Sequence, residues 1–325
     1  MILKYELLEL LKKADGYISG EEIGEQLKVS RSAVWKDIKL LREDGYVIDA
    51  VTNKGYMLKE SADVLNSVEI KNDNENAVIG KNVICFDEVD STNEVCKKMA
   101  SSESIKEGTV IAAECQNGGK GRLGRKWVSQ KGDGVWMSIL LKPDISPANI
   151  SSVTLAAGLA VCMALRNDFG IKADIKWPND ILLDNKKICG ILTEMSGQID
   201  RVDYVVVGIG INVNTESFPD GISNTATSLY IENGRKFRRC DIAKSILKNF
   251  DMIYSNFSKN GFSSIKQEYE DMCINIGRKV RVIGADNQYE ATALGVNDSG
   301  ELIVMKDSGE RTTVFSGEVS VRGVY

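Results

Sequence analysis

The sequence contains no histidine, and this absence excludes several kinds of chemistry. Catalysis by a histidine base, the Ser-His and Cys-His nucleophile pairs, and histidine-bearing metal sites are all ruled out. The 7 cysteines are scattered and none belongs to a C-x-x-C pair, so the sequence predicts neither a zinc site nor a disulfide framework. We expect reduced thiols, as in a cytoplasmic protein.

Long apolar runs and a strong excess of one charge are also missing. The longest mostly apolar segment, 153–165, has about 13 residues, whereas a membrane span needs roughly 20. Glu6 and Glu9 interrupt the amphipathic N-terminal segment, which is unlike a signal peptide. The net charge of −5 argues against non-specific coating of nucleic acid but allows a local basic element. We therefore expect a soluble protein without a membrane partner.

The 325 residues suggest two or three domains, and the first 60 residues have a distinct pattern. Apolar residues share one helical face at the N-terminus, Ser19 to Glu22 forms a capping box, and Ser30 can cap a third helix. Residues 46–58 predict a β-hairpin. Short helices joined by a tight turn and followed by a hairpin predict a winged helix-turn-helix.

The third helix of this region concentrates positive charge, although the region as a whole is not basic. Residues 30–42 carry four basic side chains and one acidic side chain, as a helix that meets DNA phosphates should. The alternative is a small interaction domain with a solvated basic face. The predicted DNA contacts are Ser30, Arg31, Ser32, Lys36 and Lys39, with Lys54 at the tip of the hairpin.

A glycine-rich segment, 119–127, matches G-x-G-x-x-G, but its surroundings do not fit a dinucleotide fingerprint. A strand-like run, 135–141, follows it instead of a helix, so we expect a loop between two strands. The loop carries Lys120, Arg122, Arg125 and Lys126 without an acidic residue, and a bound polyanion would order it. Glycines let the backbone approach phosphate, and Trp127 and Trp136 offer flat faces. This pattern predicts a phosphate or nucleotide loop; a solvated flexible loop is the alternative.

A second segment, 176–180, predicts a turn between strands that is fixed by Pro178 and Asn179. Lys187 stands just before an apolar strand, so its ammonium is expected to be held in place and to neutralise charge during acyl-phosphate formation. Asp180 is expected to orient Lys187 or to hold Mg²⁺. Lys176 is the competing lysine.

Two further segments support a ligand site. Residues 90–93 open a helix with Ser91 or Thr92 as its cap. Glycines in the strand-like segment 208–214 indicate close approach by a ligand or another strand. Beyond them, four short runs within 279–315 predict a small β-barrel or sandwich.

Taken together, the motifs at 90–93, 119–127, 176–180 and 208–214 make the chain resemble the bifunctional biotin–protein ligases that also act as biotin-operon repressors. The resemblance covers all three regions in order. It implies an α+β protein with a winged helix-turn-helix at 1–62, a mixed α/β catalytic domain of the biotin/lipoate ligase type at 63–274, and a small SH3-like β-barrel at 275–325.

The resemblance also implies a two-step reaction. Biotin and MgATP would give biotinyl-5′-adenylate, which would acylate a lysine on the biotin carrier domain of a carboxylase. The loop at 119–127 would cover the adenylate, because a bare acyl-adenylate hydrolyses. An ordered loop would favour a homodimer through the central sheet, and the dimer would place two winged domains on a palindromic operator.

Site residues follow by position in the motifs. Lys120 stands where this family commonly has arginine, so the charge is kept without the bidentate fork. The expected catalytic residues are Lys187, Arg122 and Asp180, with Asp180 also a candidate Mg²⁺ ligand. The expected biotin-binding residues are Ser91, Thr92, Asn93, Gln116, Lys120, Gly121, Arg122 and Lys187. The expected nucleotide-binding residues are Gly119, Arg122, Arg125, Trp127, Asn179 and Asn212.

Three other functions stay open from the sequence. The chain is compatible with a ligase whose N-terminal domain binds no DNA, with a ligand-sensing repressor without catalysis, and with a lipoate-type ligase. Lys187 together with the intact basic loop favours catalysis. The C-terminal region carries no catalytic constellation, and the resemblance implies that it helps carrier docking or ATP binding.

Overall fold

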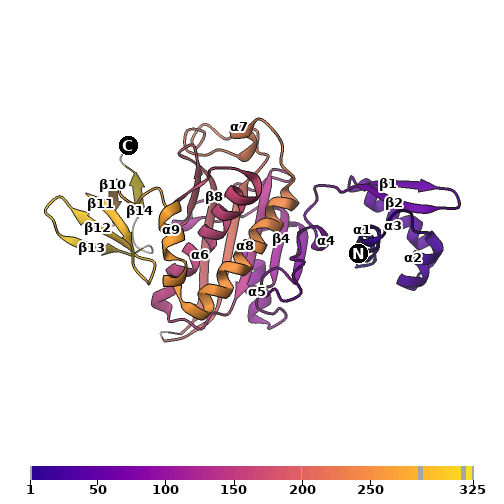
Figure 1. Ribbon diagram of the computed structural model, residues 1–325, viewed down its shortest axis with the longest axis horizontal. Coiled ribbons are helices and arrows are strands. Elements are labelled where there is room, and N and C mark those ends of the chain that lie inside the picture. The colour runs from indigo at the N-terminus through magenta and orange to yellow at the C-terminus, as the bar shows by residue number, and fades with distance from the viewer. Residues whose placement is uncertain (1, 199, 285–287, 316–319, 324–325) are drawn as a thin grey trace.

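The computed structural model describes all residues except 1, 199, 285–287, 316–319 and 324–325. Three units follow one another along the chain, and Figure 1 shows the N-terminal and C-terminal units at opposite ends of a larger central unit.

The N-terminal unit combines three helices with a two-stranded hairpin. Its elements are α1 (Ile2–Lys13), α2 (Gly20–Leu27), α3 (Arg31–Glu43), β1 (Val47–Val51) and β2 (Gly55–Glu60). Ser19 and Ser30 accept hydrogen bonds from the third backbone N–H after each of them, so both predicted caps are present. Leu7, Ile23 and Ile38 meet in one buried cluster. The winged helix-turn-helix prediction is confirmed.

The central unit is built on a seven-stranded mixed sheet of order β3-β4-β5-β9-β8-β7-β6. Only β3 and β4 pair in parallel; the other neighbours are antiparallel. The strands are β3 (Val83–Val89), β4 (Val110–Gln116), β5 (Gly134–Leu141), β6 (Asp174–Lys176), β7 (Asp180–Leu183), β8 (Lys186–Gly197) and β9 (Val202–Asn212).

Helices cover both faces of this sheet, which explains why β5 is buried along its whole length. Alternate residues of three strands separate the two faces: Ile111, Leu140 and Val206 pack with α5, while their neighbours belong to the main core. Figure 1 shows α6 and α8 across the other face. The helices are α4 (Ser67–Ile70), α5 (Thr92–Ser101), α6 (Ile150–Met163), α7 (Leu229–Asn233), α8 (Arg239–Asn260) and α9 (Lys266–Met272).

One helical segment, Pro147–Asp168, is 22 residues long and apolar enough to cross a membrane by length and composition. The helical segment is therefore longer than the apolar run at 153–165 seen in the sequence. Length alone does not distinguish a membrane span from a buried core helix. Ala156 and Leu159 are completely buried, and α6 packs against α8 and β8. The segment is a core helix of the central unit.

The C-terminal unit is an antiparallel sheet of order β13-β12-β11-β10-β14. Its strands are β10 (Lys279–Ile283), β11 (Gln288–Val296), β12 (Leu302–Lys306), β13 (Arg311–Val314) and β14 (Ser320–Gly323). The predicted small all-β region is confirmed. The unit docks through Trp177, whose backbone N–H donates to Asn275 Oδ1 (2.8 Å) and whose indole N–H donates to Gly300 O (3.0 Å).

A buried carboxylate connects the N-terminal and central units. Glu69, with 1% of its side chain exposed, lies 2.7 Å from Lys12 Nζ of α1 and 2.6 Å from Arg238, next to the start of α8. Nearby, Asn66 Nδ2 donates to the hydroxyl of Tyr46 (2.8 Å). These contacts fix the two units against each other.

Candidate active site

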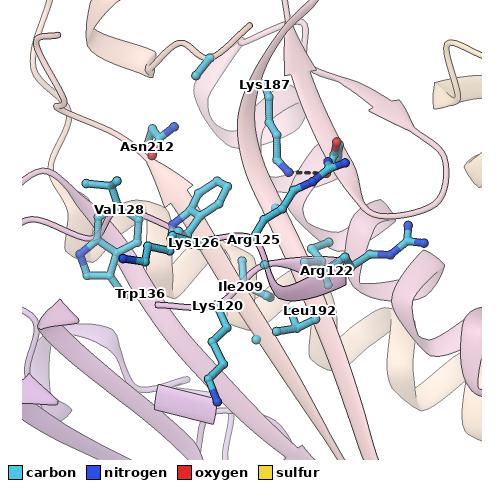
Figure 2. A pocket seen from close by; sticks show the side chains of 18 of the residues that line it. Lys120, Arg122, Arg125, Lys126, Val128, Trp136, Lys187, Leu192, Ile209 and Asn212 are labelled. Atoms are coloured by element: carbon cyan, nitrogen blue, oxygen red, sulfur yellow. Dashed lines mark ion pairs between the residues drawn. The ribbon is translucent and has the colours of Figure 1, made fainter. Parts of the chain in front are cut away.

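The segments singled out in the sequence surround one cavity in the central unit (Figure 2). Its wall is formed by the start of α5, the end of β4, the loop at 120–128, the turn at 176–180, and the middle of β8 and β9. Gly119, predicted to bind nucleotide, does not line it. We call residues 119–127 the flap. The loop at 215–226, which carries no recognisable motif, closes another side of the cavity and was not predicted.

Lys187 and Asp180 form an ion pair in the cavity wall, with 2.6 Å between Nζ and Oδ1 (Figure 2). The Lys187 backbone N–H donates to Thr225 O, and its carbonyl accepts from Thr227 N–H. These two hydrogen bonds fix the start of strand β8. Only 31% of the lysine side chain is exposed. The ammonium is therefore fixed in position, as expected from the sequence.

The flap connects β4 and β5, as predicted, and its own backbone defines its shape. Trp127 N–H donates to Gly119 O (2.9 Å), and Gly121 N–H donates to Arg125 O (2.7 Å). A Cβ atom at Gly119 would lie 2.3 Å from Trp127 O, so only glycine allows this close approach. Leu123 adopts the left-handed conformation (φ 57°) and is 67% exposed.

The cations of the flap point to different partners. The Arg122 guanidinium donates to Asn179 Oδ1 (2.9 Å) and so joins the flap to the turn at 176–180. Burial lowers the pKa of Arg122, while the nearby Asp180 opposes this shift; the guanidinium stays charged. Lys120 Nζ lies 2.7 Å from Glu94 Oε1 of α5, and this contact lowers the pKa of Glu94. Arg125 and Lys126 are exposed.

Trp127 packs on Gly210 of β9, which lies in the segment marked in the sequence, and on Gly190 of β8, which the sequence did not single out. A Cβ atom at Gly210 would lie 2.6 Å from the indole nitrogen, and one at Gly190 would lie 3.0 Å from the ring. The close approach predicted for this strand is thus made by a side chain of the same chain. Trp136 meets Trp127 edge to face, with 6.5 Å between ring centroids. The indole forms a flat wall of the cavity.

Polar residues at the opposite end of the cavity form one hydrogen-bond network. Gln116 Oε1 accepts from Thr92 N–H (2.9 Å), and Ser138 Oγ donates to Asn93 Oδ1 (2.6 Å). Asn93 Nδ2 donates to Leu192 O and to Glu194 Oε2, so neither of its N–H protons is left for a ligand. Asn93 therefore holds the network together in this structure.

Ser91 occupies the N-cap position of α5, but its side chain makes no capping hydrogen bond, and neither does Thr92. The predicted cap is wrong in this respect. Gln116 instead binds the Thr92 N–H from another strand. The sequence also gave no signal for Ser138 and Glu194, because each stands in an ordinary strand pattern and meets Asn93 only through the fold.

Asn179 and Asn212 complete the wall near Lys187. Asn179 Nδ2 donates to Ile191 O (3.0 Å), and Asn212 Nδ2 donates to Thr227 O (3.1 Å). Both asparagines thus brace the backbone around the ion pair. No cluster of three or more acidic or cysteine residues occurs in the described ranges, so Asp180 as a Mg²⁺ ligand stays a prediction.

The predicted DNA contacts lie far along the chain from the cavity, on the N-terminal unit. Arg31 pairs with Glu21 at 3.1 Å, and both side chains are more than 60% exposed. Ser30 Oγ and Ser32 Oγ are 2.8 Å apart, and Lys54 Nζ lies 5.8 Å from the Tyr17 ring. Lys36 and Lys39 are exposed on α3. All six residues face solvent.

Three family models match successive parts of the chain. An HTH domain matches residues 4–57, the biotin/lipoate A/B protein ligase family matches residues 85–212, and the biotin protein ligase C terminal domain matches residues 276–322. The second match contains the Asp90–Asn93 segment, the flap and the Lys187–Asp180 pair.

Curated proteins and solved structures agree with these matches. The chain is 38% identical over 322 residues to the bifunctional ligase/repressor BirA of Bacillus spizizenii, covering 98% of both chains. It is 29% identical to the protein of the same name from Escherichia coli, over 98% of this chain and 96% of the other. A biotin protein ligase from Aquifex aeolicus, solved in complex with biotin and ATP, matches 75% of this chain and 100% of its own, with 33% identity and a TM-score of 0.66.

Proposed function

The chain belongs to the family of bifunctional biotin–protein ligases and repressors, and we propose that its cavity joins biotin to ATP and then passes biotin to a carrier lysine. Biotin and ATP are the substrates. The acceptor is a lysine on the biotin carrier domain of a carboxylase. We place the protein in the cytoplasm, where ATP and operator DNA are available.

The polar network and the flap divide the cavity between the two substrates. We assign biotin to the end lined by Ser91, Thr92 and Gln116, where hydroxyl and amide groups suit a ureido ring. We assign the adenine to the face of Trp127, with Asn212 beside it. The biotin carboxylate and the α-phosphate then meet near Lys187, between the two ends.

The first step needs positive charge where the new bond forms. A carboxylate oxygen of biotin attacks the α-phosphorus of ATP, the bond to the bridging oxygen breaks, and pyrophosphate leaves. Lys187 is held by Asp180 and contacts the carboxylate and the bridging oxygen, while Arg122 neutralises the phosphate. Lys187 is positioned before substrate arrives, so little reorganisation of this ammonium is required.

In the second step the neutral amine of the carrier lysine attacks the acyl carbon. The bond to AMP breaks, AMP leaves, and the amine gives up a proton. Asp180 is the carboxylate beside the reacting bond and is assigned to accept this proton. Until then the flap covers the mixed anhydride and keeps water away from it.

Magnesium enters as MgATP, a substrate whose phosphates supply most of the metal's ligands. Asp133 and Asp180 are the carboxylates that line the cavity in the described part of the chain. Asp180 is already paired with Lys187, so we assign it to the metal only as a secondary contact.

The observation that carries this proposal is that a fixed ammonium, a half-buried guanidinium and a flat indole surround one cavity. The test is incubation with biotin, MgATP and a carrier domain, followed by mass spectrometry of the carrier. A gain of one biotinyl group on one lysine is expected; no gain, or modification only when lipoate replaces biotin, would contradict the proposal.

A matched pair of variants tests the assignment of Lys187. Lys187→Ala should slow transfer on the order of 100-fold, because it removes a preorganised charge. Lys186→Ala is the control, because successive side chains of a strand point to opposite faces and Lys186 does not line the cavity. Full transfer by Lys187→Ala would remove this residue from the chemistry.

The repressor function requires two winged units on one operator, and we propose a ligand-promoted homodimer. The β7 strand pairs with β8 only as far as Gly190, and Asn179 bonds Ile191, so residues 192–197 of β8 pair with β9 alone within the described chain. Met195 on this segment is 46% exposed. Arg122 of the flap contacts Asn179, which bonds Ile191 just before the open edge. A ligand that orders the flap therefore also affects the open edge of β8, through which we propose that the two copies pair.

A further inference from the structure

Trp35 is the one tryptophan that this structure leaves largely in solvent. It is 59% exposed on α3, whereas Trp136 and Trp177 are 1% exposed and Trp127 is partly covered. The core of the N-terminal unit is formed without it, because Val34, Ile38 and Leu41 turn the other face of α3 inward. A single exposed apolar side chain is ordinary on a protein surface, so the residues around Trp35 on α3 decide what it indicates.

The position of Trp35 on α3 is specific. With about 100° per residue, Trp35 lies between Arg31, one turn before it, and Lys39, one turn after it. Lys36 is also exposed beside it. Asp37, the acidic residue of the helix centre, falls on a different side and is partly buried. The indole therefore stands in the middle of a basic helix face.

This face matches the major groove of DNA better than a second copy of the chain. Cations at the margins of the helix contact the phosphates on both sides of the groove, and the centre of the helix then faces the base edges. A symmetric contact between two copies would instead bring like charges together around the indole. The apolar group that the major groove presents is the C5-methyl of thymine.

We propose that Trp35 contacts thymine methyl groups in the operator and is a specificity-determining residue of the DNA-binding surface. This inference rests on the repressor function proposed above. Arg31, Lys36 and Lys39 provide affinity that does not depend on sequence, while Trp35 discriminates between bases.

The experiment selects binding sites from a random 40-base-pair duplex library with the full chain, in the presence of biotin and MgATP. Wild type should select half-sites with fixed thymines, and Trp35→Ala should lose the preference at those positions. Uracil is then substituted for these thymines in the selected duplex. Wild-type affinity should fall about fourfold for each methyl removed, and the affinity of Trp35→Ala should not change.

Two variants of the same helix serve as controls. Leu40→Ala removes another exposed apolar side chain, about 140° around α3 from Trp35, and should keep full discrimination between thymine and uracil. Lys36→Gln should weaken binding to all sequences alike and reduce the salt dependence by about one phosphate contact. Ligase activity and thermal stability of Trp35→Ala should equal those of wild type.

Each outcome decides the inference. If Trp35→Ala discriminates thymine from uracil as wild type does, DNA binding stands but Trp35 has no part in specificity. If Trp35→Ala instead loses dimerisation in sedimentation while keeping discrimination, the indole contacts a second copy. If wild type selects no duplex, the proposed repressor function fails, and this inference fails with it.

Discussion

Two glycines of β9, separated by one residue, lie against side chains at opposite ends of the cavity. A Cβ atom at Gly208 would lie 2.3 Å from Asn93 Oδ1, and a Cβ atom at Gly210 would lie 2.6 Å from Trp127 Nε1. Asn93 belongs to the polar network, and Trp127 forms the flat wall. One strand thus positions a residue for each proposed substrate.

These glycines predict a crossed effect on the two substrates. Gly208→Ala should displace Asn93 and raise the KM for biotin roughly tenfold, while Gly210→Ala should displace Trp127 and raise the KM for ATP by a similar factor. Steady-state transfer of biotin to a carrier domain, with biotin and ATP varied in turn, measures both constants. Gly221→Ala, in an open loop position, is the control. Equal effects of both variants on the same substrate would contradict the assignment of the two ends.

For single residues, the sequence identifies those whose chemical type and spacing within a short motif indicate their role. The flap cations, Lys187 and Trp127 all stand in short motifs, and the structure brings them to one cavity. Ser138 and Glu194 could not be found, because each contacts Asn93 from a strand distant in sequence. Nor could the sequence show that Asn93 donates both of its side-chain N–H groups to acceptors within the protein.

Among the elements, the short turn at 177–180 has contacts in three directions. Trp177 donates to Gly300 of the C-terminal unit, Asn179 accepts from Arg122 of the flap, and Asp180 pairs with Lys187. A displacement of the C-terminal unit would therefore move Trp177, and through Asn179 and Asp180 it would change the positions of Arg122 and Lys187. This is a physical route by which a unit without catalytic groups affects adenylation.

A pair of glycine variants tests this route. Gly300 (φ 81°) and Gly309 (φ 85°) both need the left-handed conformation, so alanine at either should cost about 1 kcal/mol of unfolding free energy. Only at Gly300 would the new Cβ meet α6, at 2.7 Å from Leu155 Cδ1. Gly300→Ala should cost about 2 kcal/mol more and slow adenylate formation. Chemical denaturation and pyrophosphate release measure the two effects.

If Gly300→Ala and Gly309→Ala form adenylate at equal rates per folded molecule, this route is contradicted. Trp177→Phe, which keeps the ring and removes the indole N–H, should reproduce part of the Gly300→Ala effect on rate.

Helices and strands were predictable where a local rule decides them. The serine caps of α2 and α3 and the short strands of the C-terminal unit follow from capping and alternation. The order of the central sheet was not predictable, because β9 returns between β5 and β8 through long-range pairing. The open edge of β8 follows only from that order.

For the whole molecule, the buried Glu69 is one of the links between the N-terminal and central units. Burial raises the pKa of Glu69, but hydrogen bonds from Lys12 and Arg238 outweigh it, so the pKa of this carboxyl lies below its ordinary value in the folded protein. A lowered carboxylate pKa stabilises the fold above about pH 4.5, and this contribution disappears as pH falls through the folded pKa.

We therefore predict that Glu69→Gln lowers the free energy of unfolding by roughly 1–3 kcal/mol at pH 7 and makes stability depend less on pH between 5 and 3. Calorimetry across this range measures the effect. Glu43→Gln, at an exposed site of α3, is the control. A Glu69→Gln variant as stable as wild type at pH 7 would show that the contact does not hold the units together.

The open edge of β8 predicts how the dimer can be broken. Met195→Lys should prevent ligand-promoted dimerisation, because a charged side chain at a strand edge opposes pairing. Met252→Lys, an exposed methionine on α8, should leave it intact. Sedimentation velocity with and without biotin and ATP measures the change. A dimer that forms equally in Met195→Lys would place the interface elsewhere.

The central claim is that one fixed ammonium and one flap guanidinium meet at the bond being formed. A crystal structure of the chain with biotin and ATP tests it most directly. We predict that Lys187 Nζ and the Arg122 guanidinium both lie within hydrogen-bond distance of the α-phosphate, with the flap closed over the ligand. A ligand in the cavity with Arg122 directed into solvent, far from any phosphorus atom, would contradict the account.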